Sequence, residues 1–439
     1  GVSSYPAPGP ILPPKAVRAL SPSAFESVFL GFILLSGFFD VTLLTRNLRG
    51  WKRLALDRRL KDLPGAPEGY DGTREYLYRT LSAWHQIFAT LTETAALWAL
   101  FRGGLFRRMV ETAAARFGEG PAGAAALGAA LGIVLALFAL PWTVLRVFRV
   151  ERRFGFSRIS PGRFLWEQTL GVGLSGLLGA VLLGVPAALL PLPLWPLWAF
   201  GGLFGVSVAA AALMPLVVLP LLYRMRPLED PDLKERTERL LSGARLRLAG
   251  LFVADESGRS SHLNAAVTGL GRTKRILLFD TLISALTPEE VEGVLAHEVG
   301  HAASGHLNRR LGLVAVQYAA LLAPAALLLD LPALGGAFGL TGQMPGRLAL
   351  ALGLSLTAFK TVLEPAAAAL SRRQEFEADR YAFDHASDPD ALARALTKLG
   401  THELAWLPED PLTASLTRSH PTLPERLRAL GERTLSTPD

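Results

Sequence analysis

The chain has no cysteine among its 439 residues and is poor in charged residues, which make up 19% of the sequence. Without cysteine there is neither a disulfide nor a thiolate ligand, so any metal site must use His, Asp or Glu. Soluble domains carry about 25% charged residues. The low charge therefore argues against a wholly soluble protein.

Long apolar segments take the place of the missing charge. Hydrophobic residues make up 50% of the chain, and its mean hydropathy is positive. A bilayer is crossed by about 20 consecutive apolar residues. Seven segments reach or approach this length: 25–44, 82–101, 122–145, 169–190, 194–222, 311–331 and 348–370. The sequence therefore predicts a mainly α-helical, integral, multi-pass membrane protein, built as a bundle of seven transmembrane helices.

The net charge of +7 is explained by orientation in the membrane. Basic residues gather directly after the first and third predicted spans, within 46–61 and 146–163. Since cytoplasmic loops of membrane proteins are enriched in Lys and Arg, these loops are expected in the cytoplasm and the N-terminus outside. The loop between the second and third spans also carries arginines and is an exception. The lipid bilayer is thus the expected partner, and nucleic acid is not.

Polar stretches divide the chain into five parts. The lead, 1–24, is rich in proline and does not begin with methionine, as expected of a processed start. A membrane region of five helices, 25–222, follows it. Residues 223–310 and 371–439 are polar and are separated by the last helical hairpin, 311–370. Because a hairpin returns the chain to the side that it left, we expect the two polar stretches to fold together as one cytoplasmic domain.

Residues 297–301 read His-Glu-Val-Gly-His and carry the clearest chemical signal. On a helix, two His four residues apart share one face, the spacing that a single zinc ion needs, and the Glu can activate a water molecule. Thr287-Pro288-Glu289-Glu290 predicts the start of that helix, because Thr caps well, Pro suits the first position and Glu the third. His297 and His301 are therefore candidate zinc ligands, and Glu298 is the candidate catalytic base. Two histidines spaced by chance are the alternative.

His306 resembles a further ligand but is not expected to bind. It would complete a metzincin site, yet that pattern requires Gly and His at the positions of Ser304 and Leu307. If the helix continues, His306 also points roughly opposite to His297, because each residue turns the helix by about 100°.

Glu375 and Asp379 are the candidates for a third ligand. They lie in the segment 371–379, and a helix there places them on one face, four residues apart. One carboxylate could bind zinc while the other orients a ligand His from behind. A solvated helix face is the alternative, and the spacing alone does not decide.

Two more segments could contribute to a protease cleft. Residues 263–267 and 275–279 flank a glycine-rich turn and predict a β-hairpin directly before the zinc helix. A free edge strand can hold an extended peptide by main-chain pairing, although an ordinary structural hairpin is equally compatible. Farther on, His420 could donate a proton and Arg426 supplies a fixed positive charge. Either could stabilise the oxyanion of a tetrahedral intermediate; a turn followed by a helix is the simpler alternative.

Together these motifs resemble those of the type I CAAX prenyl proteases, integral-membrane zinc endopeptidases of the gluzincin class. The series is His-Glu-x-Gly-His, then Ser-Arg-x-x-Glu-Phe-x-Ala-Asp, then His-Pro-x-Leu-x-Glu-Arg-Leu. The segments 150–157, 261–265 and 274–282 agree as well, so the resemblance extends over nearly the whole chain. The smaller heat-shock-type membrane proteases share the motifs of the polar stretches, but they have fewer spans and lack the segment 150–157.

The resemblance implies roles for the candidate residues. Glu375 would be the third zinc ligand, with one zinc ion per chain, and Asp379 would support the site from behind. Asn264 and Ala265 would lie on the substrate-binding edge strand. His306 also matches a family position without being a ligand.

It further implies an architecture. His420 and Arg426 would line the cleft, and the seven helices would enclose a large water-filled chamber. A small α+β, gluzincin-like zinc protease domain, split across the last hairpin, would close the chamber on its cytoplasmic side. We expect a prokaryotic member of the family, in the bacterial inner membrane.

The expected function is zinc-dependent endoproteolysis of a peptide or protein substrate that is membrane-associated or lipidated. The family usually has Asn-Ala-Tyr-Phe where this chain has Asn264-Ala265-Ala266-Val267, so the preference for prenylated substrates stays open. The alternatives are a heat-shock-type protease for membrane protein quality control, and a non-catalytic, zinc-stabilised membrane scaffold. The presence of Glu298 argues against the scaffold, because an inactive relative is expected to lose its base before its ligands.

Overall fold

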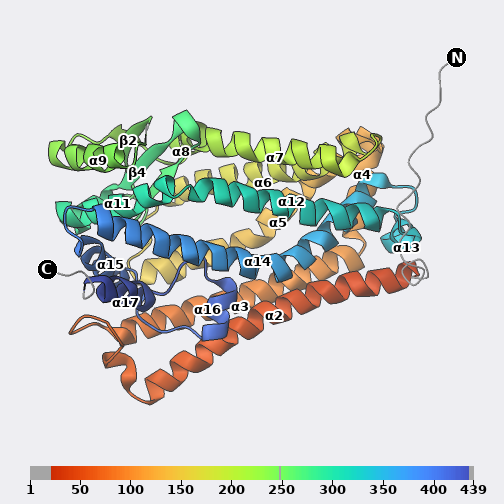
Figure 1. Cartoon of the computed structure of the whole chain (residues 1–439). Helices are drawn as coiled ribbons and strands as arrows, with labels where there is room; N and C mark the ends of the chain where they lie inside the picture. Colours follow the sequence, from red (N-terminus) through yellow and green to blue (C-terminus); the bar gives the residue numbers. More distant parts are fainter. Residues whose placement is uncertain (1–20, 247–248, 435–439) are drawn as a thin grey trace.

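The computed structural model describes residues 21–246 and 249–434 and is mainly helical (Figure 1). Long helices run side by side, and a small sheet with several shorter helices lies at one end of them. Most of the predicted lead falls outside the described residues. Its last part is helical rather than extended, since α2 (Pro22–Leu56) begins after Ser21, whose hydroxyl oxygen accepts the N–H of Ala24 at 3.1 Å.

The predicted membrane region consists of consecutive helices. After α2 come α3 (Gly72–Arg102), α4 (Leu105–Phe117), α5 (Pro121–Leu145) with its π-helical extension η2 (Arg146–Glu151), α6 (Pro161–Leu189), and α7 (Trp195–Leu213), continued by η3 (Met214–Val218) and α8 (Leu219–Leu222). The later hairpin is made of α12 (His306–Leu329) and α14 (Met344–His385), joined through α13 (Pro332–Gly336).

Each of the seven predicted spans falls on one of these helices, but the count of seven is not reached. Within 21–246 and 249–434, five helices are long and apolar enough to cross a membrane: α2, α5 with η2, α6, α7 with its continuation, and α12. A sixth is α14, if its two parts, bent by 50° relative to each other, form one span. The helix over the second predicted span, α3, does not qualify; polar residues such as Arg79 and His85 interrupt it. Seven spans therefore remain a prediction.

The α5–α6 pair shows how the bundle packs. A Cβ placed on Gly128 of α5 would lie 2.1 Å from the carbonyl oxygen of Gly179 in α6, and one on Gly132 would lie 2.1 Å from that of Ser175. Lipid provides no hydrophobic force between helices, so close contact of small residues is the main source of their association. These two backbones approach closely because glycine stands at both crossing positions.

The sheet has four strands in the order β1-β2-β4-β3. Its strands are β1 (Met225–Pro227), β2 (Gly250–Ala254), β3 (Ala265–Thr268) and β4 (Arg275–Phe279). The pair β3–β4 is antiparallel, with Ala265 opposite Leu278 and Thr268 opposite Arg275, so the predicted hairpin is confirmed. The β2–β4 pair is parallel and the β1–β2 pair antiparallel. At the edge of the sheet, β3 has one neighbour only among the described strands.

Shorter helices pack around this sheet. They are α9 (Pro231–Gly243), α10 (Asp280–Ala285), α11 (Pro288–Ala303), α15 (Ala391–His402) and α17 (Leu423–Thr434), whereas α16 (Pro411–Thr417) packs against α14 and α2. The predicted start of α11 is confirmed, because Thr287 Oγ1 accepts the N–H of Glu290 at 3.4 Å and Glu290 Oε2 accepts that of Thr287 at 2.8 Å. Buried residues of α11, α15 and β4 form one core, to which both polar stretches contribute. Leu295 and Ile276 are fully buried in it.

The two polar stretches meet at the same end of the bundle (Figure 1). α12 leads away from α11 along the bundle, and α14 returns, bends by 50° on the way, and ends at His385. The predicted boundaries at 310/311 and 370/371 therefore lie inside helices rather than at linkers. Buried Glu75 of α3 ties this end to the bundle, since its carboxylate accepts the N–H groups of Trp406 at 3.0 Å and Leu407 at 2.8 Å.

Candidate active site

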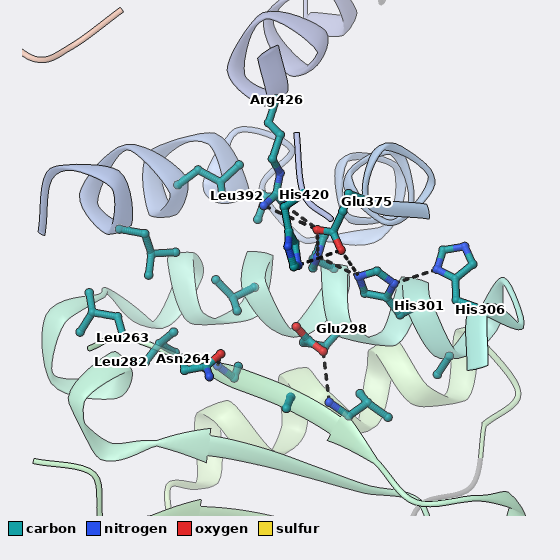
Figure 2. A pocket seen from close by; sticks show the side chains of 18 of the residues that line it. Leu263, Asn264, Leu282, Glu298, His301, His306, Glu375, Leu392, His420 and Arg426 are labelled. Atoms are coloured by element: carbon teal, nitrogen blue, oxygen red, sulfur yellow. Dashed lines mark hydrogen bonds and ion pairs between the residues drawn. The ribbon is translucent and has the colours of Figure 1, made fainter. Parts of the chain in front are cut away.

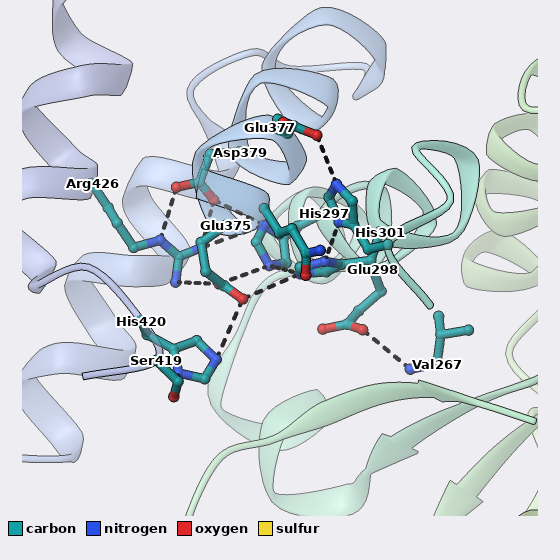
Figure 3. A network of polar contacts seen from close by, with 12 residues as sticks. Val267, His297, Glu298, His301, Glu375, Glu377, Asp379, Ser419, His420 and Arg426 are labelled. Carbon is teal, nitrogen blue, oxygen red and sulfur yellow. Dashed lines mark hydrogen bonds and ion pairs between the residues drawn. The ribbon is translucent and has the colours of Figure 1, made fainter. Parts of the chain in front are cut away.

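Three predicted ligands converge on one point between α11 and α14 (Figure 3). The Nε2 atoms of His297 and His301 are 3.1 Å apart, and the Glu375 carboxylate oxygens lie 3.6 Å from the first and 3.4 Å from the second. Tetrahedral zinc, with bonds of about 2.0–2.1 Å, places neighbouring ligand atoms about 3.3 Å apart. Among the residues that the structure describes, these three form the group suited to a metal ion, and their spacing fits zinc.

Gly300 allows the two helices to come this close. A Cβ at this position would lie 2.8 Å from the Cβ of Tyr381 and 3.2 Å from the Cα of Ala378, both in α14. A larger residue would push α14 away from α11. The glycine inside the His-Glu-x-Gly-His motif thus brings Glu375 within reach of the histidines.

Asp379 lies behind the ligand group, one helical turn beyond Glu375. Its Oδ1 is 2.9 Å from Nδ1 of His297, and its Oδ2 accepts a hydrogen bond from Arg426 Nε at 2.8 Å. Both carboxylates are 2% exposed. A proton on Nδ1, donated to Asp379, leaves Nε2 of His297 free to bind a metal. The geometry is compatible with Glu375 as a ligand and Asp379 as its support, the roles that the family resemblance implies.

His306 and Glu377 support His301 in a similar way, which the sequence reasoning missed. Nδ1 of His301 lies 2.7 Å from Nδ1 of His306, and Nε2 of His306 lies 2.9 Å from a carboxylate oxygen of Glu377. His306 lies outside the ligand group, as predicted, but the assumed continuing helix is wrong. The chain takes a left-handed conformation at Gly305, with φ of +68°, and α12 starts anew at His306. A glycine after the last periodic residue was the available signal.

Charges in the metal-free ligand group are unequally distributed. Burial lowers the pKa of His297, but hydrogen bonds to Asp379 and Glu375 outweigh it and raise the pKa to about 9. Burial and the charge on His297 lower the pKa of His301 to about 3. One imidazole therefore holds the proton that a bound metal ion would displace.

Glu298 points from α11 toward the edge strand β3 (Figure 3). Its Oε2 accepts the N–H of Val267 at 3.1 Å. Burial raises the pKa of Glu298, partly opposed by the charge on His297 and the bond from Val267. A carboxylate with a raised pKa is better suited to accept a proton from water.

The free edge of β3 follows from its register. Asn264 O accepts the N–H of Phe279 at 3.2 Å, and Ala266 lies opposite Leu277. Because hydrogen-bonded pairs alternate in an antiparallel ladder, Ala265 and Val267 turn their main-chain groups away from β4. The outward N–H of Val267 meets Glu298, and that of Ala265 donates to Asn264 Oδ1 at 2.9 Å. Asn264 and Ala265, the predicted substrate-binding residues, thus stand at the cleft, together with Val267, which was not predicted.

His420 and Arg426 reach the ligand group from the C-terminal segment. His420 Nε2 lies 3.4 Å from Glu375 Oε1, and 60% of the His420 side chain is exposed. Arg426 Nη1 lies 3.8 Å from Glu375 Oε2, but only 13% of its side chain is exposed, and its guanidinium is bonded to Asp379. The two candidates for oxyanion stabilisation therefore differ: His420 faces the cleft, whereas Arg426 lies behind the carboxylates.

A cleft of about 360 Å³ is lined by the three ligand candidates, Glu298, His306, His420, Arg426 and the edge strand, but not by Asp379 or Glu377 (Figure 2). Next to Asn264 it has an apolar wall made by Leu263, Leu282, Val294, Leu392, Leu396 and Leu399. Its other end carries the cationic residues Lys274 and Arg310. The arrangement offers a free strand edge, a base and a metal-binding group within one groove.

Comparisons with known proteins agree with this geometry. Residues 227–434 match the model of peptidase family M48, and residues 66–224 match that of the CAAX prenyl protease N-terminal region of five membrane helices. The CAAX prenyl protease 1 homolog of Arabidopsis thaliana is 30% identical over 433 residues, 92% of this chain and 97% of that protein. The chain belongs to the CAAX prenyl protease branch of peptidase family M48.

Other relatives of this M48 peptidase support the same family assignment. CAAX prenyl protease 1 of Saccharomyces cerevisiae is 30% identical over 68% of this chain and 70% of that protein. The crystal structure of S. mikatae Ste24p has a TM-score of 0.80 at 25% identity, over 92% of this chain and 98% of that one.

The predicted activity is thereby confirmed: this M48 peptidase is a multi-pass membrane metalloendopeptidase. The comparisons do not favour a quality-control protease or a non-catalytic scaffold. The relatives named above are eukaryotic and give no support to the predicted bacterial origin.

Proposed function

We propose that this peptidase hydrolyses peptide bonds at the membrane with one zinc ion held by His297, His301 and Glu375. The observation that carries the proposal is the 3.1–3.6 Å spacing of their ligand atoms. Two imidazoles and one carboxylate are a donor set of catalytic zinc sites that leave a fourth position open. When bound, zinc lowers the pKa of a water molecule and polarises the carbonyl group of the substrate.

Glu298 acts as the general base and then the general acid. It takes a proton from the attacking water and passes it to the nitrogen of the leaving amine, which breaks the peptide bond. Its contact with Val267 N–H holds the carboxylate between the ligand group and the strand edge. The reacting carbonyl of the substrate would lie there. The substrate's main chain would pair with β3 through the outward main-chain groups of Ala265 and Val267.

His420 is our choice for the group that stabilises the oxyanion. Its ring is exposed to the cleft and close to Glu375, so it can donate a hydrogen bond to a developing negative charge. Arg426 is a positioning residue in this scheme, because its guanidinium is bonded to Asp379 and keeps that carboxylate against His297.

The substrate class that we propose is a protein whose C-terminus carries a prenylated CAAX motif, the class named for the relatives. The apolar wall of the cleft can accept the aliphatic residues of such a motif. A second cavity of about 620 Å³, lined by Arg79, His85, Arg146, Glu364 and Arg418, opens among the bundle helices and the C-terminal segment. We regard it as part of the predicted chamber.

We further propose that the active site faces the cytoplasm. The basic stretches 46–61 and 146–163 lie on the loops that would share its side of the membrane. Placing the N-terminus outside follows from the same charge distribution. The α2 and α3 helices meet the C-terminal segment at the end where these basic residues lie, through Glu75 and the Arg46–Asp410 pair at 2.8 Å.

The test is cleavage of a farnesylated CAAX peptide and its plain counterpart by purified, zinc-loaded protein in detergent. Wild type should cleave the farnesylated peptide, and Glu298→Gln should lose activity by about 10²–10⁴-fold, the usual contribution of a general base. Glu289→Gln is the matched control, since Glu289 lies on the same helix but is paired with Arg236. Undiminished cleavage by Glu298→Gln would refute the mechanism. Equal cleavage of both peptides would refute the substrate class.

A further inference from the structure

His262 lies outside the ligand group, at a junction between the membrane helices and the strand edge. Its ring is stacked on Phe156, with centroids 4.7 Å apart and planes 12° apart. Nδ1 of His262 contacts a carboxylate oxygen of Glu403, and Nε2 lies 3.5 Å from a carboxylate oxygen of Glu151. One imidazole therefore bridges two acids from distant parts of the chain.

The surroundings make this histidine a cation at neutral pH. Burial alone lowers the pKa of His262, but the hydrogen bonds to Glu151 and Glu403 outweigh it and raise the pKa to about 9. Glu151 is 7% exposed and also accepts a hydrogen bond from the Tyr78 hydroxyl at 3.2 Å. The imidazole lies between the two carboxylates, one at each ring nitrogen, and Arg146 also pairs with Glu151 at 3.3 Å.

The same cluster fixes the backbone that leads into β3. The second oxygen of Glu403 accepts the N–H of Leu263 at 3.0 Å. The carbonyl of His262 accepts a hydrogen bond from the Thr281 hydroxyl at 2.8 Å. The backbone N–H of His262 donates to Ser260 Oγ at 3.0 Å. The next residues of the chain are Asn264 and Ala265, where the strand begins to face the cleft. The position of the strand edge thus depends on the position of His262.

The other partner, Glu151, belongs to the end of a membrane helix. Glu151 is the last residue of η2, which prolongs α5. Directly after it, Phe156 O accepts the N–H of Ser261 at 3.0 Å, and Ser157 pairs with Ser260. The cluster therefore connects α5, the strand edge and the C-terminal cap of α15, where Glu403 lies.

We propose that His262, held between Glu151 and Glu403, is a positioning residue that fixes the substrate-binding edge of β3 relative to the membrane helices. The inference rests on the proposed function, in which a peptide pairs with that edge. Loss of the charge would let Leu263 and Asn264 shift, and main-chain pairing with a substrate would weaken. A ligand that touches only the metal ion would not sense the change.

The experiment measures binding rather than turnover, in zinc-loaded protein that carries Glu298→Gln. Two probes are used: a fluorescein-labelled farnesylated CAAX peptide, followed by anisotropy, and acetohydroxamate, a small zinc ligand that does not reach the strand. Adding His262→Asn should raise the Kd of the peptide about tenfold, which corresponds to about 1.4 kcal/mol of lost binding free energy. The affinity for acetohydroxamate should stay within about twofold of the parent.

His402→Asn is the matched control. His402 also contacts Glu403, at 3.3 Å, on the oxygen that accepts the Leu263 N–H. Within the described residues no hydrogen bond joins its side chain to the backbone of 262–264, so its substitution should raise the peptide Kd much less than His262→Asn does. Glu403→Gln keeps an acceptor for Leu263 N–H and removes the charge. Combined with His262→Asn, it should add little to the loss, because both residues act through the same contact.

Three results would overturn the inference: an unchanged peptide Kd in His262→Asn, an equal loss of affinity for acetohydroxamate, or a parent protein that does not bind the peptide. Failure of the proposed function is a different outcome. There the parent binds the peptide and His262→Asn weakens binding, but the wild-type chain does not cleave it.

Discussion

The α5–α6 pair and the α11–α14 pair both rely on glycine for a close approach, but they are held by different interactions. In α5–α6 the backbones meet at Gly128 and Gly132, and apolar side chains such as Leu177 and Leu178 remain exposed on the outer face. In α11–α14, Gly300 allows buried imidazole and carboxylate groups to lie between the helices. The first pair depends on shape and the second on charge.

This difference follows from the surroundings. Between lipid-facing helices there is little hydrophobic force, so packing of small residues determines their association. Buried charges lose hydration, and removing one partner of a buried pair costs about 3–5 kcal/mol. The metal centre should therefore respond to a change of charge at constant size, and the bundle to a change of size at constant polarity.

The largest effect is expected from Glu375→Gln, which keeps the size of the side chain and removes its charge. Loss of a ligand should lower zinc affinity by more than the 10–100-fold typical of outer-shell residues, and peptidase activity should fall with it. Asp379→Asn should lower zinc affinity by about 10–100-fold. Zinc titration measures both, and circular dichroism should show an unchanged helix content. If Asp379→Asn lost more zinc affinity than Glu375→Gln, our assignment of the two roles would be reversed.

A smaller effect is expected from Gly128→Leu in α5, which adds size without charge. The side chain would collide with the backbone of Gly179, and overpacking costs about 1–3 kcal/mol. The midpoint of thermal unfolding in detergent should fall, while zinc affinity per folded molecule should stay at the wild-type value. Gly171→Leu in α6 is the control, since a Cβ there meets nothing within 4 Å. Equal destabilisation by both variants would contradict the packing at the crossing.

The smallest effect is expected from pH, through His262 and Glu403. The folded-state pKa of His262, about 9, exceeds its ordinary value of 6.5. Its contribution to the free energy of unfolding is therefore complete below pH 6.5 and is lost as pH rises through about 9. The pKa of Glu403 is lowered from 4.5 to about 2, so its contribution is complete above pH 4.5 and is lost as pH falls through about 2.

The unfolding temperatures of wild type and His262→Asn should therefore differ most between about pH 5 and 6.5 and converge above about pH 9. Glu151, Glu403, Glu256 and, through Glu403, His402 are the titratable groups around the imidazole. A difference that stayed constant up to pH 10 would show that His262 acts through packing alone.

Local patterns predicted those parts of the fold that depend on neighbours in sequence. The capping box at Thr287 and the hairpin of β3 and β4 are confirmed because a few adjacent residues determine each of them. The continued helix through His306 was wrong, because the left-handed conformation at Gly305 ends α11 before that residue.

Contacts between distant segments could not be predicted from spacing. His262 and Glu403 are 141 positions apart, and neither belongs to a periodic pattern that refers to the other. Val267 was missed for a related reason: a main-chain N–H has no signature in the sequence, and its direction depends on strand register. The choice between Glu375 and Asp379 needed the crossing of α11 and α14.

The position of the hairpin of α12 and α14 between the histidines and the carboxylates has a consequence for the biogenesis of the protein. The two histidines are synthesised before the hairpin of α12 and α14, and Glu375 and Asp379 follow on the second arm of that hairpin. The three ligands can therefore meet only after both arms have been inserted and the chain has returned to the side of its departure. A chain that integrated one arm in the wrong direction would leave histidines and carboxylates on opposite sides of the bilayer. On the proposed topology and ligand set, stoichiometric zinc would report that membrane integration is complete.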